Sequence, residues 1–369
     1  MKTLLGSAAA LALLAGPALA GGVERTAFSS RILFEEGSYG EASLGFAAPN
    51  VSGVQNGTGA SSGDVFDDFV IWSLGFKTDV TDRLSLAVII DQPIGAQTTY
   101  APSTYALGTG PGSSATLFNA GVTALAKYQL PRNVSVYGGI RALQTSGDVS
   151  LITTGGLYTL DTSSELDFGF VAGAAWEKPE IAARVSLTYI SPITQTFDAT
   201  EANNGTPTPV GDQQFSTTIP QSLTLEAQSG IAENTLLFGS VRWVNWSVFD
   251  ITPDAFALSG NSLVDFDDDT YTFNLGVARR FTEEWAGTAS ATYEPPTGGF
   301  SGNLGPTDGR TAITLGAVYS PNDRVDITGG VTYSWLGDTQ TESATPGVFL
   351  GDFSGNDAIS AGIRFGLKL

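Results

Sequence analysis

Residues 356–369 read NDAISAGIRFGLKL, and from Ile359 to Leu369 every second side chain is apolar. The side chains between them, from Ser360 to Lys368, are small or polar. Successive side chains of a β-strand point to opposite faces, so this segment predicts a strand with one apolar and one polar face. Residues 181–189 repeat the alternation. Such strands suit a barrel wall that separates lipid from a polar lumen.

The connections between the alternating segments are by turns short and long along the chain: each short connection is followed by a long one. Six short turns rich in Pro, Asn, Asp or Glu fall at residues 79–83, 131–133, 178–180, 232–234, 282–284 and 321–323. The connections between them run to about 10 to 20 residues and are rich in Gly, Ser, Thr, Asn and Asp, as in a barrel with short periplasmic turns and long extracellular loops. A secreted soluble β-protein also alternates, but it does not favour this division into two classes of connection.

The alternation predicts an all-β fold, a 14-stranded antiparallel transmembrane β-barrel whose even strand number returns both chain ends to the periplasm. The expected strands are 39–48, 66–78, 83–99, 115–130, 133–150, 165–177, 180–197, 214–229, 234–249, 270–281, 284–295, 309–320, 323–337 and 356–369. Aromatic residues near the strand ends are typical of girdles at the two membrane interfaces. They are Tyr128, Tyr189, Trp243, Trp246, Trp285, Tyr293, Tyr319 and Trp335.

The N-terminus has the features of a secretory signal peptide. Lys2 precedes the apolar stretch 4–14, and Ala18-Leu19-Ala20 offers a cleavage site before Gly21. A transmembrane helix needs roughly 20 apolar residues, so this stretch is too short for one. We expect three parts: a signal peptide over residues 1–20, a short plug over 21–37 and the barrel over 38–369.

Composition narrows the chemistry that this chain can perform. The chain has no histidine and no cysteine, which excludes Ser-His catalysis and thiolate chemistry. The adjacent carboxylates Asp67-Asp68 and Glu35-Glu36 would point to opposite faces of a strand, so we interpret them as solvated. Zinc-ligand spacing, calcium loops and phosphate-binding glycine loops are also missing from the sequence. We expect no enzyme, no cofactor and no metal site.

The formal net charge of −20 at pH 7 disfavours nucleic acid as a partner. Acidic residues gather in the predicted long connections, for example at Asp265 and at residues 267–269. On an outer-membrane protein these side chains could meet the divalent cations that bridge lipopolysaccharide phosphates. A solvated acidic loop is the alternative interpretation.

Several segments resemble the FadL/TodX family (OMPP1) of outer-membrane transporters for long-chain fatty acids and other hydrophobic compounds. They are Ile219–Leu225 (IPQSLTL), Trp243–Phe249 (WVNWSVF), 269–276 (DTYTFNLG), 293–296 (YEPP), 308–310 (DGR) and 314–319 (TLGAVY). In the third expected strand, residues 91–95 (DQPIG) interrupt the alternation. The resemblance implies a fourteen-stranded barrel with an N-terminal plug, an inward kink in that strand, and a place in the outer membrane of a Gram-negative bacterium.

Two features depart from the family pattern. The Asn-Pro-Ala-like plug motif is missing and the segment before the first strand is short, so the family's ligand contacts in the plug cannot be carried over. The chain ends in Leu369 rather than in the aromatic residue that the barrel-assembly machinery favours, although Phe365 keeps an aromatic on the same face. We expect that machinery to be a partner nonetheless.

Transport of a hydrophobic small molecule is the function that the sequence favours. Large apolar residues in predicted outer loops, at Phe256, Leu258, Phe349 and Phe353, are candidates for the first capture site. The alternative is packing of one loop on another. Thr252-Pro253 predicts the start of a short helix that carries Phe256. An aqueous porin and a structural outer-membrane protein are the competing functions.

Two further sets of residues are candidates for the transport path. If the ligand is a fatty acid, a lumen-facing arginine could pair with its carboxylate, and alternation nominates Arg141, Arg184 and Arg364. The alternative is that each arginine pairs with a wall carboxylate such as Glu226. Pro93 lacks an amide donor and Gly95 tolerates unusual backbone angles, so this point is a candidate gate, with a harmless bulge as the alternative.

Overall fold

The computed structural model describes residues 22–101, 105, 112–153, 155–343 and 347–369. The predicted signal peptide, residues 1–20, lies outside them. The described chain forms a closed barrel of fourteen antiparallel wall strands, so the predicted fold class is confirmed. The last strand pairs with the first, from Asp357 opposite Asn50 to Lys368 opposite Tyr39, and this ladder closes the wall.

Each predicted strand corresponds to one wall strand, built from one or two segments. The segments are β1 (Tyr39–Asn50), β3 (Phe69–Asp79), β4 (Leu84–Asp91) with β5 (Ala96–Thr99), β6 (Ser114–Gln129), β7 (Val134–Thr153), β8 (Gly156–Thr162) with β9 (Glu165–Lys178), β10 (Ala183–Ile190) with β11 (Ile193–Asn203), β13 (Gln214–Ile219) with β14 (Ser222–Ala232), β15 (Thr235–Val244), β18 (Thr270–Arg280), β19 (Trp285–Glu294), β21 (Arg310–Asn322), β22 (Val325–Leu336) and β25 (Asp357–Lys368).

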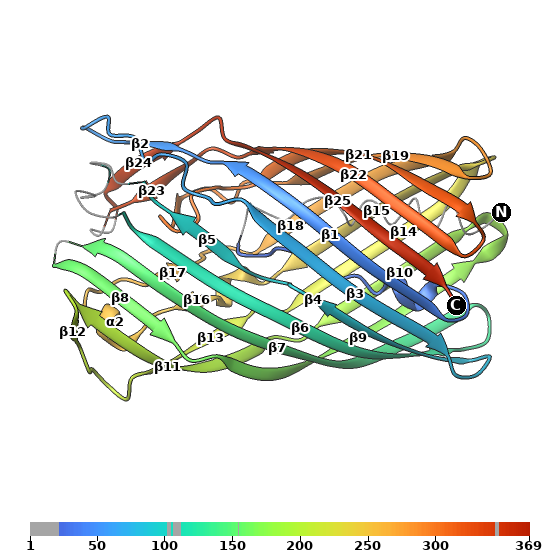
Figure 1. Cartoon of the computed structure of the whole chain (residues 1–369), viewed down its shortest axis with the longest axis horizontal. Coiled ribbons are helices and arrows are strands. Elements are labelled where there is room, and N and C mark those ends of the chain that lie inside the picture. The colour runs from blue at the N-terminus through green and yellow to red at the C-terminus, as the bar shows by residue number, and fades with distance from the viewer. Residues whose placement is uncertain (1–21, 102–104, 106–111, 154, 344–346) are drawn as a thin grey trace.

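The remaining elements lie outside the fourteen wall strands, although the two-residue strand Thr206–Pro207 pairs with the end of β11 and so extends the wall sheet. They are η2 (Arg31–Phe34), η4 (Pro179–Ile181), η5 (Trp246–Val248), α2 (Asp254–Ala257), β2 (Gly53–Gln55), β12 (Thr206–Pro207), β16 (Asp250–Ile251), β17 (Val264–Asp265), β20 (Phe300–Ser301), β23 (Thr339–Glu342) and β24 (Phe349–Phe353). β2, β24, β23 and β20 form a small sheet beyond the wall. Figure 1 shows the C-terminus at one end of the barrel and α2, β12 and β24 at the other. Within the described part of the chain, none of the helices has the length and apolar character needed to span a membrane.

The wall strands sort their side chains as the alternation predicts. In β9, Leu166, Phe168 and Phe170 are exposed on the outside, and Phe168 is 65% exposed. Polar side chains such as Asn119 and Thr123 of β6 are buried inside. The short turns fall where the sequence places them, and Asn234, at the turn between β14 and β15, has a φ of 57° that asparagine tolerates well.

Besides the third strand, whose interruption at residues 91–95 the sequence predicts, two of the predicted strands are not continuous. The expected strand 180–197 breaks between β10 and β11 at Ser191-Pro192, and the expected strand 214–229 breaks between β13 and β14 at Pro220-Gln221. The reason is the missing amide of proline, which removes a donor from the ladder. β10 pairs with β9 and β14, and β11 pairs with β8 and β13, so the same wall strands stay neighbours on both sides of the breaks.

The segment before the first strand lies within the barrel. We call residues 22–37 the N-terminal segment. Phe28, Ile32 and Leu33 of this segment are buried in one apolar cluster with Leu125 and Tyr137 of the wall. The cluster packs η2 against the wall inside the barrel.

Ion pairs and hydrogen bonds tie the end of this segment to the wall. The buried Lys77 of β3 donates hydrogen bonds to the carbonyl oxygens of Glu35, at 2.7 Å, and Gly37, at 2.9 Å. Arg31 pairs with Glu41 of β1 at 2.9 Å. These contacts fix the last residues of the N-terminal segment to two wall strands, β1 and β3.

Candidate functional site

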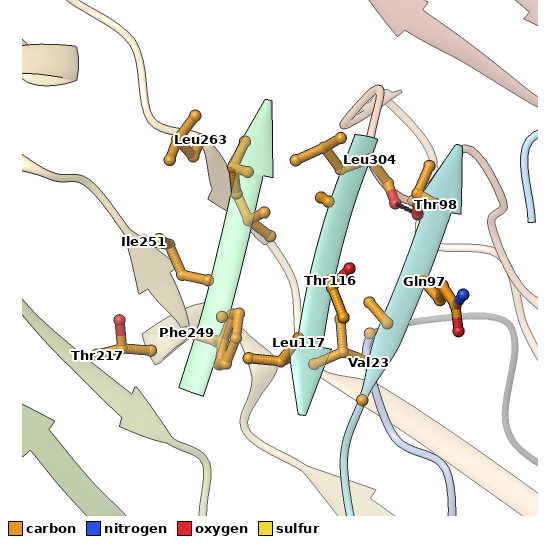
Figure 2. A pocket seen from close by; sticks show the side chains of 18 of the residues that line it. Val23, Gln97, Thr98, Thr116, Leu117, Thr217, Phe249, Ile251, Leu263 and Leu304 are labelled. Atoms are coloured by element: carbon orange, nitrogen blue, oxygen red, sulfur yellow. Dashed lines mark hydrogen bonds between the residues drawn. The ribbon is translucent and has the colours of Figure 1, made fainter. Parts of the chain in front are cut away.

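A cavity of about 130 Å³ lies inside the barrel toward the long connections, and we call it the apolar cavity. Figure 2 shows Ile251 and Leu263 on one side of it and Thr98 and Leu304 on the other. Its lining includes six phenylalanines: Phe66, Phe69, Phe197, Phe215, Phe249 and Phe266. Such a cavity takes apolar ligands, because burying apolar surface stabilises the complex and few polar groups must be desolvated.

Wall strands and one inward-folded connection build this cavity. Phe197 of β11 stands opposite Phe215 of β13, and their rings stack at 5.4 Å. Residues 245–269, which join β15 to β18, fold into the barrel mouth and bring Phe249 to the cavity. Trp246 packs on Phe249 at 5.6 Å and is itself buried.

Asp269 holds the two ends of this connection together. Its carboxylate accepts hydrogen bonds from the Trp243 indole at 2.9 Å, the Asn245 amide at 2.8 Å and the Ser247 hydroxyl at 2.7 Å. Burial alone would raise the pKa of Asp269, but the hydrogen bonds from Asn245, Ser247 and Trp243 outweigh it and lower the pKa below its ordinary value. The ionised carboxylate therefore stabilises the inward fold.

A second connection covers the cavity from outside. The Thr98 hydroxyl donates a hydrogen bond to the Leu304 carbonyl at 2.9 Å, drawn as a dashed line in Figure 2. The Tyr100 hydroxyl donates one to the Asn303 carbonyl at 2.6 Å. Residues 302–307 are thereby tied to the third wall strand, above the cavity.

The third wall strand turns inward beneath the cavity. The ladder between β3 and β4 ends at Leu74 and Ile90, and the amide of Trp72 then donates to the side-chain oxygen of Gln92 at 3.1 Å. The freed backbone of residues 92–95 pairs with the N-terminal segment. Lipid offers backbone groups no such partners, which accounts for the inward course.

The contact between the kink and the N-terminal segment is a short antiparallel bridge. Glu24 and Ile94 are the bridge partners. The Arg25 amide donates to the Pro93 carbonyl at 2.8 Å, and the Gly95 amide donates to the Val23 carbonyl at 2.9 Å. Glu24 also pairs through its carboxylate with Arg242 of β15 at 2.5 Å. The bridge therefore joins the kink, the N-terminal segment and the opposite wall.

A lower cavity of about 190 Å³ lies on the periplasmic side of this bridge. Lumen residues such as Glu226 and Arg242 line one part of it. Phe46 of β1 and Trp72 of β3 also line it, and both are exposed apolar residues of the outer wall. The lower cavity thus reaches the wall beside β3, where the ladder to β4 has ended.

The structure separates the residues that the sequence nominates for capture. Leu258 follows α2 at the extracellular end and is 74% exposed. Phe256 of α2 packs on Tyr158 at 5.0 Å, in a cluster with Leu263 and Phe197 that continues to the apolar cavity. α2 itself lacks the predicted Thr252 cap. The carboxylate of Glu201 accepts the amides of residues 255 and 256 instead.

The two predicted capture residues of β24 differ from each other. Phe349 is partly buried, whereas Phe353 is fully buried, at 0% exposure. Phe353 packs edge-on against Tyr105 at 6.1 Å, in a cluster with Leu336. The expectation of an exposed Phe353 is therefore wrong, because the small outer sheet folds this side chain inward onto the barrel mouth.

Arg141 and Arg364 face the lumen, as predicted, but both lie near wall carboxylates. Arg141 is buried and pairs with Asp91 of β4 at 3.1 Å. Arg364 lies 3.9 Å from Glu41 and donates a hydrogen bond to Thr328 at 3.3 Å. These contacts match the alternative interpretation, in which each arginine pairs with a wall carboxylate.

Arg184 has a different environment, although it also faces the lumen. It donates a hydrogen bond to the Gln228 side chain at 3.2 Å and lies 4.4 Å from the ring centroid of Phe34. Its guanidinium thus helps to pack the N-terminal segment onto the wall. A ligand role for Arg184 stays a prediction.

Sequence reasoning missed Arg25, the one basic side chain among the described residues that line the apolar cavity. It lies on the N-terminal segment, which lacks strand alternation and the family's plug motif, so no periodic pattern selects it. It also missed Phe197 and Phe215. Odd-numbered side chains such as Leu187 of β10 and Leu225 of β14 are exposed on the outside, but beyond the breaks at Pro192 and Pro220 the odd-numbered Phe197 and Phe215 are buried and line the cavity.

The profile of the outer membrane protein transport protein family (OMPP1/FadL/TodX) matches residues 3–363. No curated protein matches the sequence. The fold is similar to that of a Pseudomonas aeruginosa FadL homologue, with a TM-score of 0.74 at 16% identity over 96% of this chain and 97% of the other.

Two toluene transporters have related folds. The Pseudomonas putida protein TodX gives a TM-score of 0.66 at 12% identity, with 96% of this chain and 100% of the other covered. The Ralstonia pickettii protein TbuX gives a TM-score of 0.63 at 16% identity, with 92% of this chain and 91% of the other covered. At these identities the structures show the fold, and the family profile shows membership. The chain belongs to the outer membrane transport family OMPP1/FadL/TodX, and its barrel lies in the outer membrane.

Proposed function

We propose that this barrel takes up hydrophobic small molecules from outside the cell and releases them sideways through its wall. It does so without catalysis. The observation that carries the proposal is the phenylalanine-lined cavity, which sits directly above an inward kink of the wall. Burial of one large apolar ligand group in such a cavity stabilises the complex by roughly 1.5 to 3 kcal/mol, enough for at least tenfold in affinity.

Capture begins at the outer connections. Leu258 offers an exposed apolar surface, and the cluster of Phe256, Leu263 and Phe197 leads from α2 to the cavity. A ligand that moves along this cluster stays in contact with apolar side chains. Phe349 contributes from the opposite rim, while Phe353 supports the outer sheet from within.

The geometry below the cavity favours sideways release over passage into the periplasm. Phe28, Ile32 and Leu33 of the N-terminal segment fill the lumen beneath, so we propose that residues 21–37 act as a plug. The lower cavity instead reaches Phe46 and Trp72 on the outer wall. Separation of the bridge at Pro93 and Gly95 would join the two cavities and complete the path into lipid.

Long-chain fatty acids and monoaromatic hydrocarbons are both candidate ligands. TodX and TbuX, whose folds are similar, are described as toluene transporters. We propose further that lipid and lipopolysaccharide surround the wall and that the barrel-assembly machinery inserts it, with Phe365 on the last strand as its aromatic signal. The exposed side chain of Phe365 supports both contacts.

Two measurements on the same preparation test the transport proposal against an aqueous porin. Cells that produce the barrel should accumulate oleate, dodecane or toluene faster than cells without it. The purified barrel in a planar bilayer should show no steady ion conductance, because the apolar cluster around η2 closes the lumen. A steady conductance without hydrophobic uptake would favour the porin.

A further inference from the structure

Arg25 lies between the apolar cavity and the lower cavity and lines both. Its guanidinium carbon stands 3.9 Å from the ring centroid of Phe69. Stacking on a ring uses the flat face of a guanidinium, while its N–H donors point outward in the plane. The contact with Phe69 therefore positions Arg25 without using its hydrogen-bonding capacity.

The side chain of Arg25 has no hydrogen bond or ion pair to any described residue, and its Nε is buried without a partner. The neighbouring arginines differ in this respect. Arg242 is paired with Glu24, and Arg141 is paired with Asp91. Arg25 is partly buried, and a cation that has lost part of its hydration without gaining an anion is suited to an anionic group from a ligand.

Two of the three carboxylates that line the same cavity are engaged elsewhere. Glu24 binds Arg242, and Asp67 accepts a hydrogen bond from Thr99 at 3.0 Å. Asp265 stands opposite Asp250 in the β16–β17 pair, at the outer end. None of the three forms an ion pair with Arg25 within the part of the chain that the structure describes.

The backbone fixes the position of Arg25 on the kink. Its amide is bound to the carbonyl of Pro93, and its side chain crosses Gly95, where an added Cβ would come within 2.6 Å of Nε. Only glycine leaves this space without displacing the arginine. The guanidinium is therefore held at the floor of the cavity before a ligand arrives, which lowers the ordering cost of binding.

We propose that Arg25 binds the carboxylate of the ligand and gives the apolar cavity a preference for amphipathic monocarboxylates over neutral molecules of the same size. This inference rests on the proposed transport function and names the ligand class of its cavity. The apolar body of the ligand lies among Phe197, Phe215 and Phe249. Its carboxylate accepts N–H groups of Arg25 at the floor, next to the kink.

The test compares octanoate with octan-1-ol, which share a chain length and differ in the head group. Calorimetric titration of the purified barrel should show tighter binding of octanoate. Arg25→Gln should weaken octanoate binding roughly tenfold or more, the range of a charge-assisted hydrogen bond, and leave octanol binding nearly unchanged. Arg25→Lys keeps the positive charge but loses the planar array of guanidinium donors. Its affinity for octanoate should lie between those of the wild type and Arg25→Gln.

Arg279→Gln serves as the matched control, because Arg279 is exposed on β18 and lies outside both cavities. It removes the same charge and should leave both affinities unchanged. Equal weakening of octanoate and octanol in Arg25→Gln would overturn the inference and make Arg25 a packing residue. Unchanged octanoate binding would overturn it too. Failure of the wild-type barrel to bind either ligand would instead overturn the transport proposal itself, and this inference with it.

Discussion

The amide of Arg25 donates a 2.8 Å hydrogen bond to the carbonyl of Pro93, and this bond joins the N-terminal segment to the kinked third strand. The same two pieces of chain separate the apolar cavity from the lower cavity. The proposed release through the wall requires this contact to open.

Restoring a regular strand at the kink should slow uptake. The double variant Pro93→Val with Gly95→Thr returns an amide donor and the alternating pattern. It also places a Cβ within 2.6 Å of Arg25 Nε, so overpacking of roughly 1 to 3 kcal/mol must displace the arginine. Uptake of a hydrophobic ligand is measured in cells with equal amounts of folded barrel. Transport at the wild-type rate would show that the kink is no gate and would favour a harmless bulge.

Breaking the Glu24–Arg242 pair should loosen the N-terminal segment. Glu24→Gln leaves Arg242 as an unpaired cation, and loss of one partner of a buried pair costs about 3 to 5 kcal/mol. We expect ion leakage through the barrel in planar bilayers. Glu36→Gln is the control, since Glu36 lies on the same segment and is exposed. If neither variant leaks ions, the Glu24–Arg242 pair does not hold the N-terminal segment in place.

Removing a ring from the cavity should weaken ligand binding. Phe215→Ser deletes half of the stacked pair with Phe197, and the loss of roughly 1.5 to 3 kcal/mol corresponds to tenfold or more in affinity. The control Phe281→Ser changes an exposed ring near a periplasmic turn. Titration with octanoate compares the two. Similar affinities for both variants would place the ligand outside this cavity.

The two phenylalanines of β24 should respond differently to substitution. Phe353→Ser deletes a fully buried ring and should destabilise the outer sheet by roughly 3 to 5 kcal/mol. Phe349→Ser should leave that sheet intact and slow capture. Limited proteolysis of the outer connections reports the first effect, and initial uptake rates report the second. Equal protease resistance of wild type and Phe353→Ser would contradict the buried assignment.

Acid should release the connection that Asp269 holds. The pKa of Asp269 is lowered in the folded barrel, so its stabilisation is complete above the ordinary carboxyl pKa and is lost as the pH falls through the lower, folded value. Asp269→Asn should loosen residues 245–269 already at neutral pH. Hydrogen exchange of this connection provides the measurement. Identical exchange in wild type and variant at pH 7 would mean that the carboxylate charge is dispensable.

Sequence alone predicted the wall well, because a membrane imposes one period on every strand. The alternation in residues 356–369 and the short turns placed all of the wall strands. The sequence did not predict the breaks at Pro192 and Pro220, because each proline lies inside a stretch that is expected to form one continuous strand. The structure shows that the buried face changes there, from even-numbered residues such as Thr188 of β10 to odd-numbered residues such as Ile193 of β11.

The site was harder to predict, because its residues come from parts of the chain that have no period. Pro93 and Gly95 stood out because they interrupt an alternating strand, and the structure shows their backbones hydrogen-bonded to the N-terminal segment. Phe353 and Arg25 had no such signal. The burial of Phe353 depends on how β24 packs, and the exposure of Arg25 to the cavity depends on where the N-terminal segment crosses the lumen.

The most direct test of sideways release locks the bridge with a disulfide. Glu24 and Ile94 are antiparallel partners flanked by the hydrogen bonds of their neighbours, a non-hydrogen-bonded pair whose Cα atoms lie about 4.5 Å apart, within reach of a disulfide. The chain has no cysteine of its own, so Glu24→Cys with Ile94→Cys forms a single defined crosslink. Each single cysteine variant controls for the loss of its side chain. Uptake of a hydrophobic ligand should stop in the oxidised double variant and return on reduction, whereas equal uptake in both states would contradict release through an opening between the kink and the N-terminal segment.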